Sequence, residues 1–290
     1  MAHPLFQGCG TALITPFKNG RIDFPAFGRL IDFQLANGIS ALVVCGTTGE
    51  PATMTDGEWE SAVAFAVKRA QGRVPVIAGT GGNNTQIVIE KARRARALGA
   101  DAQLCVTPFY NKTTQTGLIA HYRAIVRDGA LPVIVYNVPA RTGLNMQPAT
   151  LAALADEENI IAVKEASGSI AQVMEMMRLC GEKVAFYSGA DELTAPVMAM
   201  GGRGVISVLS NIAPRQMAEL AAAPVREAAK RNIALLPLMN AMMSEVNPIP
   251  VKAAAAMMGL CRNELRLPLI PMSREGKARM KQEMQKAGIL

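Results

Sequence analysis

Residues 160–168 decide the fold and supply the first candidate for chemistry: Ile160-Ile161-Ala162-Val163-Lys164-Glu165-Ala166-Ser167-Gly168. Four apolar residues before a polar segment are typical of a strand buried on both faces, so Lys164 is expected where that strand ends. Burial lowers the pKa of a lysine and frees its amine to form a Schiff base with a ketone. In the alternative interpretation, Lys164 extends into solvent or pairs with Glu165, and this stretch alone favours that alternative.

Similar apolar runs recur along the chain, each followed by a segment with helical periodicity. We expect strands at 13–14, 41–45, 74–78, 102–106, 133–135, 160–163, 184–187 and 204–208. We expect the helices that follow them at about 26–37, 56–70, 85–98, 116–128, from 148, 169–180, 191–200 and from 214. Eight such units predict an α/β fold, a (β/α)8 TIM barrel with right-handed crossovers, rather than an open doubly wound sheet. A dinucleotide-binding fold is disfavoured because Gly79-Thr80-Gly81-Gly82 does not complete the glycine motif.

The last part of the chain has a different pattern. Residues 226–290 carry Ala, Met and Leu at helical spacing, interrupted by Asn247-Pro248-Ile249-Pro250. We therefore predict two domains: a catalytic barrel over residues 1–225, and a C-terminal α-helical extension of two or three helices over residues 226–290.

The composition limits the classes of function. The chain has 290 residues, 50% of them hydrophobic, and five widely spaced cysteines, which suits a soluble, reduced, cytoplasmic protein. The net charge of +7 is dispersed, and the densest basic cluster, at residues 91–96, has no interleaved aromatic residues, which argues against nucleic-acid binding. The two histidines, His3 and His121, are far apart, which argues against a catalytic zinc.

Active sites of such barrels form at the carboxyl ends of the strands. The residues expected at those ends are Thr15, Gly46 to Glu50, Tyr110, Tyr136, Arg141, Lys164, Gly189 and Ile206. The backbone N–H groups of Gly46-Thr47-Thr48-Gly49 can hold a carboxylate, and the hydroxyls of Thr47 and Tyr136 can pass protons. Arg141 offers a planar fork for a second carboxylate. Each residue alone has an ordinary structural explanation, but together they predict a lysine-dependent barrel enzyme that acts on a small keto acid.

The chain also resembles a known family. Gly46-Thr47-Thr48-Gly49-Glu50, residues 136–143, Lys164-Glu165-Ala166 and residues 204–208 are similar to the signatures of the dihydrodipicolinate synthase / N-acetylneuraminate lyase family. The likeness extends over nearly the whole chain. Within that family, an arginine at the position of Arg141 is typical of the synthases rather than of the sialic acid lyases.

The resemblance implies a role for each candidate residue. Lys164 would form an imine with pyruvate, whose carboxylate would rest on the N–H groups of Thr47 and Thr48. Tyr136 would be the general acid/base, linked through Thr47 to Tyr110. Arg141 would orient aspartate semialdehyde, and the product would be 4-hydroxy-tetrahydrodipicolinate, an intermediate toward diaminopimelate and lysine. Gly189 and Ile206 would line the pocket.

The resemblance also bears on cofactors and assembly. It implies no metal or organic cofactor, because the lysine itself is the electron sink. In the family, the tyrosine matching Tyr110 reaches into a neighbouring subunit. A homodimer is then the smallest active unit, and a tetramer is the usual assembly.

The resemblance further bears on regulation. Lysine-inhibited relatives hold the inhibitor with a histidine and a glutamate, where this chain has Asp56 and Ile87. Phe109 stands where a tyrosine is common and Pro51 where a serine often stands, while Asn83 is retained. We expect weak or absent feedback inhibition by lysine, because Ile87 offers the inhibitor's ammonium no carboxylate.

Two alternatives remain open on the sequence. The chain could be a related pyruvate-dependent aldolase or lyase that uses another aldehyde or sugar acid; Arg141 and Tyr110 argue against it. It could also be a non-catalytic relative that binds a keto acid as a sensor or assembly partner, against which Lys164, Tyr136 and Thr47 argue.

Overall fold

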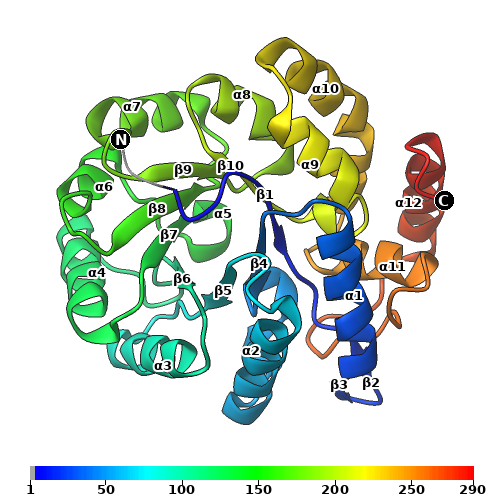
Figure 1. The fold of residues 1–290 in the computed structure, drawn as a ribbon, viewed down its shortest axis with the longest axis horizontal. Helices are drawn as coiled ribbons and strands as arrows, with labels where there is room; N and C mark the ends of the chain where they lie inside the picture. Colours follow the sequence, from blue (N-terminus) through cyan, green and yellow to red (C-terminus); the bar gives the residue numbers. More distant parts are fainter. Residues whose placement is uncertain (1–3) are drawn as a thin grey trace.

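A closed barrel of eight parallel strands forms the centre of the computed structural model, which describes residues 4–290 (Figure 1). The strands follow one another around the barrel in the order β1-β10-β9-β8-β7-β6-β5-β4. Their bounds are β1 Gly8–Ala12, β4 Ala41–Val44, β5 Val76–Gly79, β6 Ala102–Val106, β7 Val133–Asn137, β8 Ile160–Glu165, β9 Ala185–Ser188 and β10 Gly204–Ser207. The predicted (β/α)8 barrel is confirmed, and His3 lies outside the described residues.

Helices surround the barrel and cover its outer face (Figure 1). Their bounds are α1 Phe24–Ala36, α2 Asp56–Ala70, α3 Thr85–Ala97, α4 Gln115–Gly129, α6 Pro148–Leu154, α7 Ile170–Cys180, α8 Thr194–Ala199 and α9 Pro214–Ala222. Several of these helices begin at a residue whose side chain caps the first turn. Thr55 and Glu58 form a reciprocal capping box at the start of α2, and Asn84 caps α3.

The first strand differs from the prediction. It spans β1 Gly8–Ala12 and ends before Leu13 and Ile14, where the strand was expected. A Cβ at Gly10 would lie 3.0 Å from the Phe6 ring, because Phe6 packs under the barrel against Tyr187 with ring centroids 4.2 Å apart. The strand therefore needs small residues at this point. Small residues do not form the run of large apolar side chains by which the other strands were predicted. The short hairpin of β2 Phe17–Lys18 and β3 Arg21–Ile22, and helix α5 Pro139–Thr142, were also not predicted.

Alternate residues of each strand face the barrel interior and the helices. Val43 of β4 belongs to a buried cluster with Ile77 and Ile134, whereas its neighbour Leu42 packs in the layer that includes Trp59 of α2. By the same alternation, Ala162 lies in the interior cluster and Lys164, two residues on, continues that face at the carboxyl end of β8. The strand pattern thus directs Lys164 into the barrel mouth.

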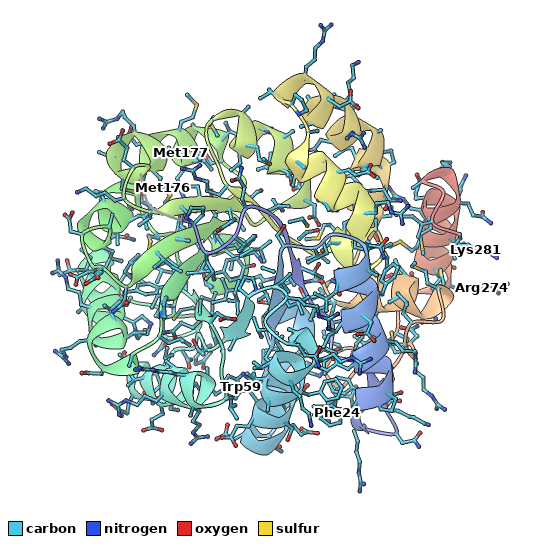
Figure 2. All side chains as sticks on the ribbon, viewed as in Figure 1. Phe24, Trp59, Met176, Met177, Arg274 and Lys281 are labelled. Atoms are coloured by element: carbon cyan, nitrogen blue, oxygen red, sulfur yellow. The ribbon has the colours of Figure 1, made fainter. Side chains whose placement is uncertain are left out.

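The C-terminal part contributes three helices, α10 Val225–Met242, α11 Ile249–Met257 and α12 Arg274–Lys286. They lie together at one side of the barrel (Figure 1), with α12 packed against both α10 and α11. Figure 2 shows Arg274 and Lys281 on the exposed side of α12, whereas Met280 of the same helix is buried. Three helices agree with the number expected, and the division into two domains near residue 225 stays a prediction.

Candidate active site

Lys164 is the central candidate, and it is buried at the carboxyl end of β8 with 4% of its surface exposed. It pairs in register with Tyr136 of β7, and its Nζ lies 4.4 Å from the centroid of the Tyr136 ring. Burial lowers the pKa of Lys164 to about 8; Asp191 raises this pKa and Arg141 lowers it further. A larger fraction of the amine is therefore neutral and nucleophilic near neutral pH than for an ordinary, solvated lysine.

The surroundings of Lys164 contradict the alternative of a solvated or ion-paired lysine. The Glu165 carboxylate instead accepts hydrogen bonds from Ser167 N at 2.7 Å and from Asn137 Nδ2 at 2.8 Å. On the other side, a Cβ at Gly189 would lie 3.1 Å from Lys164 Cε and 2.7 Å from Ala166 Cβ. The glycine thus leaves the space that the buried lysine side chain needs.

The turn that follows β4 forms the second part of the site. Thr47–Gly49 make one turn of 3-10 helix, whose first N–H groups have no acceptor within the turn and can bind an anion. The turn is held by Thr15, whose hydroxyl donates to Gly49 O at 2.8 Å, and by Asn247, whose Nδ2 donates to Thr48 Oγ1 at 3.0 Å. The predicted carboxylate-binding turn is therefore rigidly supported.

Tyr136 and Arg141 come from β7 and from α5, directly after it. Burial raises the pKa of Tyr136 to about 12, an effect that Arg141 reduces and Glu165 reinforces, so its hydroxyl keeps the proton at neutral pH. Arg141 is exposed to solvent, and its Nη2 donates to Asn247 O at 3.1 Å. A proton donor and a fixed cation thus flank the lysine.

A cavity of about 510 Å³ connects the turn after β4 with Tyr136 and Arg141. Thr47, Tyr136 and Arg141 line it, whereas Thr48, Lys164 and Ile206 are buried and are not among its lining residues. Lys164 adjoins the cavity through its contact with the Tyr136 ring. The C-terminal part also supplies lining residues that the sequence analysis missed, namely Val246, Asn247, Pro248, Pro268 and Leu269. The segment Asn247-Pro248-Ile249-Pro250 was expected to interrupt the C-terminal helices, and no pattern in it indicated that Asn247 and Pro248 line the site.

Tyr110 is a predicted catalytic residue that lies away from the cavity. Its side chain is 91% exposed, and its backbone takes the left-handed conformation with φ 67°. The preceding residue, Phe109, does line the cavity. The loop after β6 thus directs Tyr110 away from the molecule, and its expected contribution to a neighbouring subunit stays a prediction.

Four of the five residues singled out for regulation line the same cavity. Pro51, Asn83, Ile87 and Phe109 line it, whereas Asp56 lies on the surface with its carboxylate 3.2 Å from Arg94 Nη1.

Within residues 4–290, no group of three or more His, Cys, Asp or Glu side chains is placed to hold a metal ion. No helix in the same range is long and apolar enough to cross a membrane.

Comparisons with known proteins agree with this geometry. A relative from Alkaliphilus oremlandii, named 4-hydroxy-tetrahydrodipicolinate synthase, is 48% identical over 99% of this chain and 100% of its own. The relative of the same name from Geotalea uraniireducens is 47% identical with the same coverage. The solved dihydrodipicolinate synthase of Thermotoga maritima superimposes with a TM-score of 0.97 at 42% identity, over 99% of this chain and 100% of that one.

A family model described as the dihydrodipicolinate synthetase family matches residues 5–287. The match includes all the elements that carry Lys164, Tyr136, Arg141 and the turn at Thr47. This chain therefore belongs to the dihydrodipicolinate synthetase family.

Proposed function

We propose that this protein is a 4-hydroxy-tetrahydrodipicolinate synthase, a lyase that condenses pyruvate, bound as a Schiff base on Lys164, with aspartate semialdehyde. The observation that carries the proposal is the buried Lys164 against the ring of Tyr136, which lines one cavity together with Arg141. The names of the relatives from Alkaliphilus oremlandii and Geotalea uraniireducens support it. They favour this synthase over an aldolase for another aldehyde.

The first half of the proposed reaction loads pyruvate. The neutral amine of Lys164 attacks the ketone carbon, and after uptake of one proton water leaves to give an iminium ion. The pyruvate carboxylate rests on the N–H groups of Thr47 and Thr48. Loss of a proton from the methyl group gives an enamine, with Tyr136 and Thr47 carrying protons. The iminium nitrogen takes up the electron pair, so the step needs no cofactor.

The second half joins the two substrates. Arg141 binds the carboxylate of aspartate semialdehyde, and the enamine carbon attacks its aldehyde carbon, whose oxygen gains a proton. The amino group of the new side chain then attacks the iminium carbon and displaces Lys164. This closes the ring of 4-hydroxy-tetrahydrodipicolinate and regenerates the amine, in the diaminopimelate route to lysine.

A coupled assay tests the proposal. Purified protein with pyruvate and aspartate semialdehyde is followed by a downstream reductase and its nicotinamide cofactor. Rapid cofactor oxidation is the expected result. Absence of turnover, with pyruvate still trapped on the protein by borohydride, would indicate an aldolase for a different aldehyde. If the protein shows neither turnover nor trapping of pyruvate, it is non-catalytic.

The rate of imine formation is expected to rise with pH around 8 and to level off above it. Below the pKa of Lys164, about 8, the amine is protonated and cannot attack the ketone. Cyanoborohydride trapping, read by mass spectrometry from about pH 6 to about pH 10, measures this profile. A midpoint at the ordinary lysine value would show that burial does not tune Lys164.

Lysine is expected to inhibit the enzyme weakly or not at all. Ile87 and Phe109 line the cavity without offering a carboxylate, and Asp56 is paired with Arg94. The carboxylate of Glu50, which also lines the cavity, is paired with Lys252, so it is not available for the inhibitor's ammonium. A related structure from Cyanidioschyzon merolae has lysine bound, which makes that enzyme a suitable control in the coupled assay. Half-inhibition by sub-millimolar lysine would contradict the prediction.

The proposal includes assembly and location. We propose a homotetramer, a dimer of dimers in which Tyr110 of one subunit completes the site of the next. Its 91% exposure in the single chain is compatible with that role. Because one structural neighbour is a monomeric variant, the mass in solution has to be measured directly. The unpaired thiols of all five cysteines support a reducing, cytoplasmic location.

A further inference from the structure

A fully buried ion pair joins the C-terminal part to the barrel. Lys252 of α11 and Glu50 lie with Nζ and Oε1 2.5 Å apart, and their side chains are 0% and 1% exposed. The ammonium also donates to Glu264 O at 2.8 Å and lies 4.0 Å from the centroid of the Phe17 ring. Burying two charges is costly, and apolar side chains of similar volume would hold α11 at least as well. A role in holding the Glu50 carboxylate at a fixed position accounts for this ion pair better than a contribution to stability alone.

Glu50 is attached to the functional turn. Its backbone has φ 57° and joins two short 3-10 turns, and its N–H donates to Thr47 O at 3.2 Å. Glu50 and Thr47 both line the cavity. A shift of the Glu50 carboxylate would therefore be transmitted over three residues to the N–H groups of Thr47 and Thr48.

Other residues of the C-terminal part also hold this turn. The backbone N–H of Arg266 donates to Glu50 Oε2 at 3.3 Å, and Asn247, just before α11, donates to the Thr48 hydroxyl at 3.0 Å. The Arg266 guanidinium lies 4.3 Å from the Phe17 ring centroid, the ring that also faces Lys252. The C-terminal part thus contacts the turn at Thr48 and, directly after the turn, at Glu50, which forms the ion pair with Lys252.

We propose that Lys252 is a positioning residue: through its ion pair with Glu50, it places the N–H groups of Thr47 and Thr48 to receive the carboxylate of pyruvate. This rests on the proposed function, because it assumes that pyruvate is the ligand of the turn. Arg141 has no bond to Glu50 and contacts only Asn247 O among these groups. The pair is therefore expected to affect pyruvate binding more than binding of the second substrate.

The test compares Lys252→Met with the unaltered protein. Met keeps the length of the aliphatic chain but cannot pair with Glu50. We expect KM for pyruvate to rise by roughly 10- to 100-fold, because a displaced binding group weakens a fixed contact. Turnover at saturating pyruvate, and KM for aspartate semialdehyde, should change by less than about threefold. Cyanoborohydride trapping at low pyruvate should slow in proportion.

Two further variants separate positioning from stability. Leu238→Ala removes a buried side chain from α10, and is expected to lower the melting temperature while leaving KM for pyruvate unaltered. If Lys252→Met fails to fold because Glu50 is left unpaired, Glu50→Gln with Lys252→Met removes both charges. The double variant should fold, because it leaves no buried charge unpaired. It should still show the raised KM for pyruvate, because it lacks the ion pair.

The outcomes are distinct. A folded Lys252→Met protein, or a folded double variant, with KM for pyruvate within about twofold of the unaltered protein overturns the positioning role and leaves a structural one. That result leaves the proposed function intact, since the unaltered protein still traps pyruvate. If the unaltered protein itself traps no pyruvate, the proposed function fails, and the role of Lys252 fails with it.

Discussion

Replacing Lys164 with alanine is expected to abolish trapping of pyruvate by borohydride and to lower turnover on the order of 10⁴-fold or more. The amine is the group that forms the covalent bond, and the residual site can only hold the substrates near each other. The fold should persist, because a cation buried at the barrel mouth is itself destabilised by its loss of hydration. Mass spectrometry after reduction measures trapping, and circular dichroism measures folding.

Lys183→Ala is the matched control for this change. Lys183 lies on the surface, with its Nζ 2.6 Å from Asp156 Oδ1, so its loss should leave both trapping and turnover unaltered. Continued trapping by Lys164→Ala would show that another amine carries the imine. Lys91, which lines the same cavity, would then be the first residue to examine by peptide mapping.

Replacing Arg141 with alanine is expected to spare the imine and to impair the second substrate. A charge-assisted bond to a carboxylate contributes about 1.5–3 kcal/mol, so KM for aspartate semialdehyde should rise by roughly 10- to 100-fold. Turnover should also fall, because the aldehyde is no longer oriented toward the enamine. Steady-state kinetics at saturating pyruvate measure both effects.

The pH of the trapping experiment matters for this variant. Arg141 lowers the pKa of Lys164, so its removal should raise that pKa and move the trapping profile to higher pH. Trapping should therefore equal that of the unaltered protein only on the alkaline plateau. Arg141→Lys keeps a charge without the planar fork and should give intermediate kinetics. Full activity of Arg141→Ala would leave the synthase assignment without its main support.

The outline of the fold could be predicted because its signals are local. Buried parallel strands read as short apolar runs, and their alternation with helical segments allows few topologies. Lys164 could be singled out for the same reason, since it follows one of those runs. The strand at Gly8–Ala12 could not, because packing around Phe6 requires small residues there rather than apolar ones.

The sequence by itself determined the number of strand–helix units, the place of every strand but the first, and the position of Lys164 at the carboxyl end of β8. It also determined the set Thr47, Tyr136 and Arg141 at the same rim. The tertiary structure alone decided that Lys164 is buried against Tyr136, that Tyr110 faces away from the cavity, and that Asn247 and Lys252 hold the turn after β4. Desolvation and pairing depend on groups far apart in the chain, such as Glu50 and Lys252. Periodicity within a short window carries no information about such contacts.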